Sequence, residues 1–292
     1  MRQKLIDIVL AVFGFLDDCV TVLKQMVYVF SLLIQPRRTK FQENSGRDVL
    51  VLANGPSVKE VDLDKVLASV DDVVCMNWFG LQEEKFKQVK PNYYCLVDAI
   101  FFGDAEVYSE KRDELFRVFA SIDWDITFIC PCGMTLPIEN PHFKYVWVNN
   151  NVFYGERLIK LAQFLYKRNL ASLGMETVAL CPLSYFISTK ARRIYLLGID
   201  MSEFKGYVIN EKNEIYLETK HFYGTSRMRA DGVGGFNKGE FYKLFASYQK
   251  MFEQFYYAQK YAQAQGVEVR NLSLESFVDV FEKDATFQKE RS

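Results

Sequence analysis

The chain has 292 residues, of which 49% are hydrophobic and 15% aromatic, and its formal net charge is −1 at pH 7. That much apolar material can form a sizeable core, so the composition excludes a largely disordered chain. A charge this close to zero lacks the basic surplus of nucleic-acid-binding proteins, and we expect no nucleic-acid partner. The six cysteines form neither a CxxC pair nor a zinc spacing, so we expect reduced thiols in a cytosolic compartment.

Residues 5–34 are much more apolar than the rest of the chain, and polar residues interrupt them every three to four positions. This spacing predicts a helix with a narrow polar stripe and a broad apolar face. The longest apolar run, residues 8–16, is shorter than the roughly 20 residues needed to cross a bilayer. We therefore expect the helix to lie in a membrane interface, with packing on the protein or on a second subunit of a homo-oligomer as the alternative. The basic residues that would meet anionic headgroups are Arg37, Arg38 and Lys40.

Residues 35–47 contain a proline and an Asn-Ser-Gly turn, and they are expected to form a linker. We therefore divide the chain into an N-terminal segment, residues 1–47, and one main domain, residues 48–292. In the main domain, short apolar runs typical of buried parallel strands alternate with helical patterns. The expected strands are residues 49–53, 73–76, 93–97, 126–130, 143–148, 194–197 and 267–269. The expected helices are residues 57–69, 105–120, 155–170, 176–189, 239–265 and 274–281.

This alternation predicts an α/β fold with a doubly wound, mostly parallel sheet. Residues 201–239 interrupt the pattern, because they are rich in glycine, lysine, arginine and tyrosine and show little periodicity. We expect them to form a lid or a small inserted lobe.

The turn after the first strand of the main domain is the first candidate for ligand binding. Ser57 and Glu60 match a capping box, and the free N–H groups of the helix that it would start suit a phosphate. Gly55 would let a ligand approach the backbone closely, and the Asn54 amide would bind a base, ribose or phosphate oxygen. The alternative is an ordinary capped turn without a ligand, since neither a GxGxxG nor a Walker pattern is present.

Three further polar residues lie just past the ends of expected strands, and ligands of open α/β sheets bind at the carboxyl ends of the strands. These residues are Asn77, Asp98 and Asp200. Each taken alone is more often a cap or loop anchor, but together they suggest a nucleotide site at one edge of the sheet.

The chain has two histidines, His142 and His221. His142 follows a proline in what reads as a turn, whereas His221 lies in the expected lid and is the candidate general base for a sugar hydroxyl. The neighbouring Tyr223, Arg227 and Arg229 would offset the charge of a departing phosphate, and a solvated loop histidine is the alternative.

Two Asp-x-Asp sequences match the pattern with which many nucleotide-sugar enzymes hold a divalent cation. Asp62 and Asp64 fall within the expected first helix of the main domain. Asp123 and Asp125 precede an expected strand and so lie at the opposite end of the sheet. Both positions favour surface carboxylates, so we expect metal-independent chemistry.

In order and spacing these motifs resemble those of the family 42 sialyltransferases, which sialylate bacterial lipooligosaccharides. The resemblance runs from about residue 49 to residue 281. It rests on Asn-Gly-Pro-Ser-Val-Lys-Glu-Val-Asp at residues 54–62, Cys-Met-Asn at 75–77, Ile-Tyr-Leu-Leu-Gly-Ile-Asp at 194–200, and His-Phe-Tyr-Gly at 221–224.

The resemblance implies a modified GT-A or Rossmann-like nucleotide-sugar fold with a lid. It implies an enzyme that takes CMP-sialic acid as donor, needs no metal or other cofactor, and inverts the anomeric carbon. His221 would be the general base, and Asn54, Asn77 and Asp200 would line the CMP site. The acceptor would be a cell-surface glycan or glycolipid such as lipooligosaccharide or capsule, which places the enzyme on the cytoplasmic side of the inner membrane as a peripheral protein.

The sequence departs from the family at two places. The family's Ser-Gly near the donor appears as Leu173-Gly174, with Ser172 one position earlier, so Ser172 and Gly174 are the corresponding candidates. The family's phosphate-binding tyrosines after Gly-Ile-Asp are replaced by Met-Ser, and Tyr207 is only an approximate substitute.

Two other functions remain open. The same Asn-Gly-Pro-Ser turn occurs in pterin pyrophosphokinase-like proteins and in flagellin-modifying transferases, so a pyrophosphokinase dependent on ATP and magnesium is the alternative enzyme. A non-catalytic membrane scaffold would keep the turn only as an element of the fold.

Overall fold

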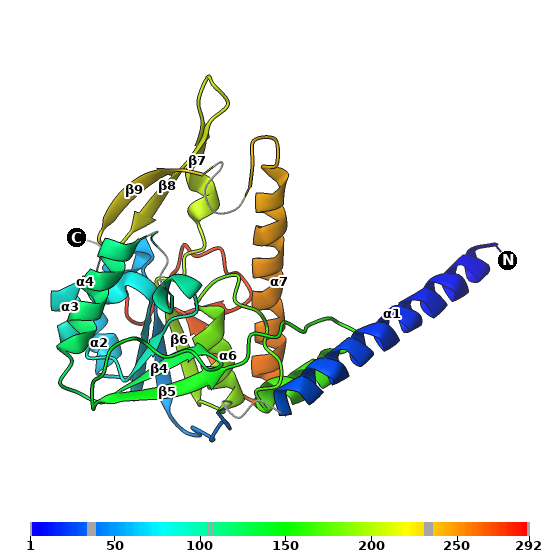
Figure 1. The fold of residues 1–292 in the computed structure, drawn as a ribbon, viewed down its shortest axis with the longest axis horizontal. Coiled ribbons are helices and arrows are strands. Elements are labelled where there is room, and N and C mark those ends of the chain that lie inside the picture. The colour runs from blue at the N-terminus through cyan, green and yellow to red at the C-terminus, as the bar shows by residue number, and fades with distance from the viewer. Residues whose placement is uncertain (1, 34–38, 104–105, 107, 231–235, 291–292) are drawn as a thin grey trace.

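A computed structural model of the chain describes residues 2–33, 39–103, 106, 108–230 and 236–290. An eight-stranded parallel sheet flanked by helices forms the body, which confirms the predicted α/β class (Figure 1). The strand order is β11-β10-β6-β1-β2-β3-β4-β5. The strands are β1 Asp48–Leu52, β2 Asp72–Met76, β3 Tyr93–Cys95, β4 Ile126–Pro131, β5 Phe143–Val148, β6 Arg193–Leu197, β10 Glu268–Asn271 and β11 Glu282–Lys283.

The two central strands, β1 and β6, determine where a ligand can bind. From β1 the chain builds the sheet outward through β2, β3, β4 and β5, and then returns to place β6 on the other side of β1. Leu52 pairs with Leu197, so the two strands end side by side. The connections leave these ends in opposite directions, and such a divergence opens a crevice at the carboxyl edge of the sheet.

Helices cover both faces of the sheet because alternate residues of each strand point to opposite sides. Val49 and Val51 of β1 face one buried cluster, which includes residues of α5, α6 and α7. Leu50 and Leu52 face the other cluster, with α2, α3 and α4. The helices are α1 Arg2–Leu33, α2 Leu63–Leu67, α3 Glu83–Val89, α4 Ser109–Ala120, α5 Ile159–Lys167, α6 Leu180–Ser188 and α7 Tyr242–Gln265, with short 3-10 helices η1 Pro56–Lys59, η2 Asn77–Leu81, η3 Ala99–Phe101 and η4 Glu203–Gly206.

The helix predicted over residues 57–69 is replaced by two separate elements, η1 and α2. The predicted capping box is also wrong, because the Ser57 hydroxyl lies 2.7 Å from the Ser273 hydroxyl instead of capping a helix. Asp62 is the residue that caps α2, since its carboxylate accepts a hydrogen bond from the Lys65 N–H at 3.3 Å.

The helix predicted over residues 274–281 is absent, and this part of the chain is irregular. Side chains hold it in place: the Ser276 hydroxyl donates to the Ile199 carbonyl at 2.7 Å, and the Lys283 amine donates to the carbonyls of Ser273 and Ser276. These bonds satisfy backbone groups that a helix would otherwise pair, so the irregular path is stable.

The segment predicted to form a lid or a small inserted lobe, residues 201–239, contains η4 and a three-stranded antiparallel sheet that stands out from the body (Figure 1). Its strands are β7 Tyr207–Ile209, β8 Ile215–His221 and β9 Gly224–Arg229, and residues 231–235 lie outside the described part. β9 is exposed along its whole length, so neither of its faces needs the apolar alternation that marks a half-buried strand.

The predicted N-terminal helix is present as α1, which extends away from the body as one straight helix (Figure 1). In the described residues, no helix combines the length and the apolar character needed to span a membrane. The last turns of α1 join the body, where Tyr28 and Val29 pack on the buried cluster that includes residues of α5, α6 and α7.

Candidate functional site

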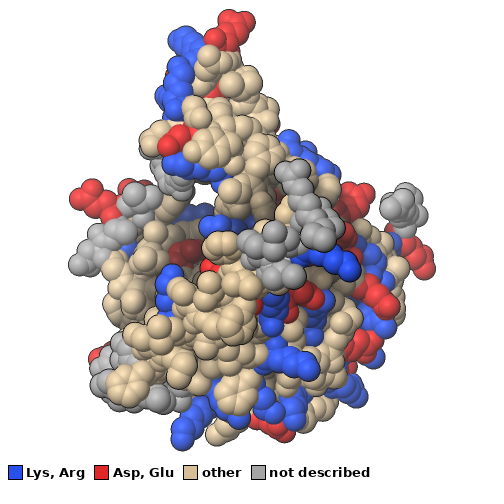
Figure 2. All heavy atoms as spheres, turned by 90° about the vertical axis from the view of Figure 1, so that its right-hand side faces the viewer, with Lys and Arg blue, Asp and Glu red and all other residues tan. Residues whose placement is uncertain are grey.

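A cavity of about 380 Å³ opens at the carboxyl ends of β1, β2 and β6. The walls come from the turn after β1, the first residues after β2 and β6, residues 177–179 before α6, and the end of β8. Figure 2 shows the corresponding hollow in the surface below the projecting sheet. Of the residues predicted for the site, the cavity brings together Asn54, Gly55, Asn77, Asp200 and His221.

The ends of β1 and β6 are locked together by Gly55 and Asp200. The Gly55 N–H donates to the Gly198 carbonyl at 2.8 Å, and the Ser57 N–H donates to the Asp200 carboxylate at 3.1 Å. A β-carbon on Gly55 would lie 2.2 Å from that same carboxylate oxygen. Gly55 is therefore needed for the close approach of Asp200, and the Ser57 N–H that was predicted to meet a phosphate is already occupied.

Several residues that line this cavity carry an unpaired polar atom. Buried side-chain oxygens of four cavity residues have no hydrogen-bond partner within the described chain, and they belong to Asn54, Asn77, Asp200 and Glu203. Buried polar atoms are normally paired, and an unpaired one costs about 1–3 kcal/mol. All four are acceptors that belong to cavity-lining residues and are shielded from water, so a ligand rich in hydroxyl or amine donors would pair with them once these side chains turn toward it.

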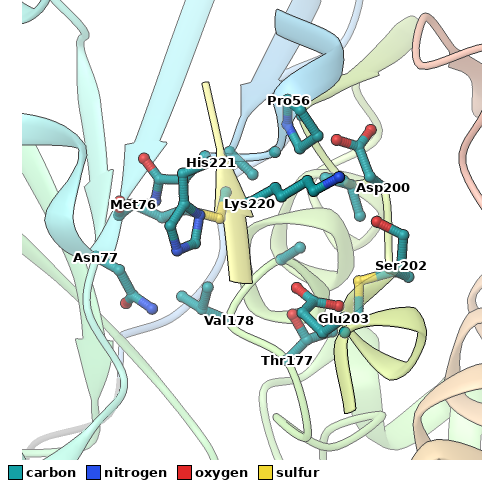
Figure 3. Close-up of a pocket in the computed structure, with 18 of the residues that line it drawn as sticks. Pro56, Met76, Asn77, Thr177, Val178, Asp200, Ser202, Glu203, Lys220 and His221 are labelled. Atoms are coloured by element: carbon teal, nitrogen blue, oxygen red, sulfur yellow. Dashed lines mark hydrogen bonds between the residues drawn. The ribbon is translucent and has the colours of Figure 1, made fainter. Parts of the chain in front are cut away.

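Two of the seven non-glycine residues with a positive φ in the described part of the chain lie at this edge of the sheet. Asn77 follows β2 directly and Met201 follows Asp200, and both have a φ of 49°, in the left-handed region that non-glycine residues rarely adopt. Asn77 lies across the cavity from Ser202 and Glu203 in Figure 3. Such conformations cost about 1–3 kcal/mol and cluster at functional sites, so both positions support a binding role for this edge of the sheet.

His221 is the histidine of the site, at the end of β8. Its ring stacks on Tyr223, with centroids 5.0 Å apart and an interplanar angle of 17°. Burial lowers the pKa of His221, and the charge of Lys111 lowers it further, while a hydrogen bond to the Asn54 backbone opposes the shift. The imidazole is therefore neutral at pH 7, and one of its nitrogens is free to accept a proton.

Phe222 fixes the position of this histidine. It is 6% exposed, its ring packs on Phe79 at 5.5 Å, and its N–H donates to the Asn54 carbonyl at 3.1 Å. The tip of the β8–β9 hairpin is thus anchored on the turn after β1. This anchor places His221 next to the polar residues at the strand ends.

Lysines, not arginines, supply the cations of the cavity, whose lining includes Lys205 and Lys220. The side chain of Lys220 extends across the cavity toward Asp200 (Figure 3). The expected arginines do not line the cavity but lie on β9. There Arg227 pairs with Glu218 at 3.5 Å, and Arg229 pairs with Glu214 at 3.2 Å.

Several predicted residues lie elsewhere. Ser172 and Gly174 border a separate, very small cavity beside Asn149, and Asp98 is exposed after β3. Tyr207 packs on Phe241 with ring centroids 5.7 Å apart, and Tyr223 reaches the site only through its stacking on His221. The Ser57 hydroxyl bonds to Ser273, as described above.

Sequence reasoning missed two acidic residues on the cavity wall, Glu218 and Glu203. Burial raises the pKa of the Glu203 carboxyl, and the nearby charge of Asp200 raises it further. The place of Glu203 three positions after the Gly-Ile-Asp motif, in the first turn of η4, was the available signal.

The described residues contain no group of three or more His, Cys, Asp or Glu side chains placed to hold a metal ion. Asp62 caps α2, and Asp125 pairs with His142 and Lys144 at 3.1 and 2.7 Å. Comparison of the sequence with family models gives no match, and a search of curated proteins finds no similar sequence. The function is therefore inferred from the site and from the motif resemblance described above.

Proposed function

We propose that the protein is an inverting, metal-independent glycosyltransferase of the family 42 sialyltransferase type, with a GT-A or Rossmann-like body. CMP-sialic acid is the donor to test first, and a cell-surface glycan is the acceptor. One observation carries the proposal: a neutral imidazole, His221, lies on the wall of a cavity at the sheet's carboxyl edge, beside unpaired acceptor atoms.

The donor would occupy the cavity with its nucleotide against the strand ends. A volume of about 380 Å³ lies within the roughly 300–1,000 Å³ usual for small-molecule sites. Asn54, Asn77 and Asp200 offer hydrogen-bond acceptors to the ribose hydroxyls and the cytosine amine. The projecting sheet of β7, β8 and β9 would serve as the lid, held at its tip by Phe222.

The reaction joins the acceptor oxygen to the anomeric carbon as the bond from that carbon to the phosphate oxygen breaks. The acceptor proton passes to the free nitrogen of His221, which is neutral for the reason given above. CMP leaves with the electron pair of the broken bond. Lys220 offsets its negative charge, in the role that the family gives to tyrosines absent here.

By the same resemblance, the enzyme would act on lipooligosaccharide or capsule glycans from the cytoplasmic side of the inner membrane, as a peripheral protein. A glycan synthesised on a lipid carrier is available only at that surface, so the donor cavity must lie within reach of it.

The test is a calorimetric titration with CMP in the presence of EDTA, followed by an assay of CMP release from CMP-sialic acid with and without a lactoside acceptor. We expect CMP to bind without metal and the acceptor to increase its release. Failure to bind CMP, or binding of ATP or UDP that requires a divalent cation, would reject the proposal in favour of a pyrophosphokinase or another transferase.

A further inference from the structure

The helix α1 meets the body through its polar side. Three polar residues on one side of the helix each contact a polar residue in the loop that follows β5. The pairs are Asp18 with Arg157 at 3.5 Å, Gln25 with Asn151 at 2.6 Å, and Tyr28 with Asn149 at 3.5 Å. An amphipathic helix that packs on its own protein normally buries its apolar face, so this arrangement is inverted.

The apolar side of α1 therefore faces away from the body. Its large hydrophobic side chains are 41–67% exposed, and they are Ile6, Leu10, Val12, Phe13, Phe15, Leu16, Val20, Leu23, Met26, Val27 and Phe30. At 3.6 residues per turn, these positions spread over about 220° of the helix circumference. Exposed apolar surface of this extent marks an interaction site.

The width of the apolar face distinguishes between two occupants. A second copy of the chain would form a helix pair, whose seam is a narrow stripe of a and d positions and leaves much of a 220° face in water. A lipid interface accepts a helix to about half its depth and covers a broad face. The bilayer therefore accounts for more of this surface than a dimer does.

Cationic residues lie close to the region where α1 joins the body. α5 follows directly on the loop that holds α1, and it exposes a phenylalanine covered by an arginine, Phe164 and Arg168, 3.6 Å apart. Lys160 and Lys167 are exposed on α5 as well, and Lys40 is exposed after α1. The expected headgroup residues Arg37 and Arg38 lie outside the described residues. Such cations favour a surface of anionic lipid.

We infer that the outward face of α1 docks the protein onto an anionic bilayer, with the helix lying flat in the headgroup region and its polar side holding the body. The three polar pairs set the orientation, so the body approaches the lipid from one direction only. This inference stands on the surface of α1 and does not depend on the reaction proposed for the cavity.

Flotation of the full chain with phosphatidylcholine vesicles, with and without phosphatidylglycerol, tests the inference. The variant Leu16→Glu/Val20→Glu changes two side chains that are 52% and 51% exposed on α1. Its matched control, Val208→Glu/Ile209→Glu, changes exposed apolar residues on β7. Each large side chain withheld from lipid is worth at least about tenfold in binding, so we expect about 100-fold weaker partitioning for the α1 variant and none of this loss for the control.

Wild-type binding should be stronger with phosphatidylglycerol and weaker at high salt, because screening reduces the attraction of the cations. Thermal unfolding of both variants should match the wild type, since all four side chains are exposed. Equal flotation of the α1 variant and the wild type would overturn the inference. So would a wild-type dimer that does not float and that the α1 substitutions convert to a monomer, because the face would then be a contact between copies.

Discussion

Replacement of His221 by alanine tests the proposed chemistry most directly. The cavity wall positions this imidazole through Phe222 and Tyr223, and a positioned general base is worth about 10²–10⁴ in rate. We therefore expect His221→Ala to lower kcat by about that factor. The affinity for CMP should change little, because the binding acceptors belong to Asn54, Asn77 and Asp200.

The pH profile of the wild type gives a second measurement. Burial lowers the pKa of His221 from its ordinary value of 6.5, so the rate should fall on the acidic side only below that pH. In the His221→Ala variant this fall in rate at acidic pH should be absent, because no imidazole remains at the site to be protonated. The matched control is His142→Ala, whose ring pairs with Asp125 on the surface, away from the cavity. If His221→Ala keeps most of the transferase activity and the same acidic limb, His221 is not the base.

Two other predictions concern the charged residues of the cavity. Lys220→Met should lower kcat with CMP-sialic acid about 10–100-fold, and less with a donor whose leaving group is already a weak base, since less charge then needs to be offset. Glu203→Gln should stabilise the protein at pH 8 and have little effect at pH 4, measured by thermal unfolding. The sign follows from the raised pKa of Glu203 in the folded protein. At low pH the carboxyl is protonated in both the folded and the unfolded protein, but as pH rises the unfolded protein loses this proton more readily. The wild type therefore loses stability as pH rises, whereas the glutamine variant has no proton to lose.

The sequence predicted the sheet well because its strands are short apolar runs, each bounded by turns. β1 is buried at all five positions, and its hydrophobic residues leave no other plausible element. Parallel strand ends meet at one edge, so Asn54, Asn77 and Asp200 could be grouped before their contacts were known. The same reasoning failed for Asp98, because it assigns a residue to an edge but not to a cavity.

What the sequence could not predict depends on partners far along the chain. The inward direction of the polar side of α1 depends on Asn149, Asn151 and Arg157, which nothing in residues 2–33 identifies. Gly55 was predicted to let a ligand approach the backbone, but in the fold it is Asp200 that approaches it closely. This contact arises only when β6 lies beside β1. Ser172 and Gly174 were placed by analogy with a motif, and the fold carries them to another cavity.

The residues that line the cavity differ in how much they contribute to the stability of the fold. Gly55, Gly198 and Asp200 lie in the turns that follow β1 and β6 and hold the two strand ends together, so a change at any of them disturbs this junction. Lys205 and Lys220 are exposed cavity residues that lie on η4 and β8, outside the central sheet. We therefore expect substitutions at these two lysines to change the behaviour of the cavity at little cost to the fold. Ligand preference can therefore evolve, or be engineered, at these lysines while the turns after β1 and β6 preserve the fold.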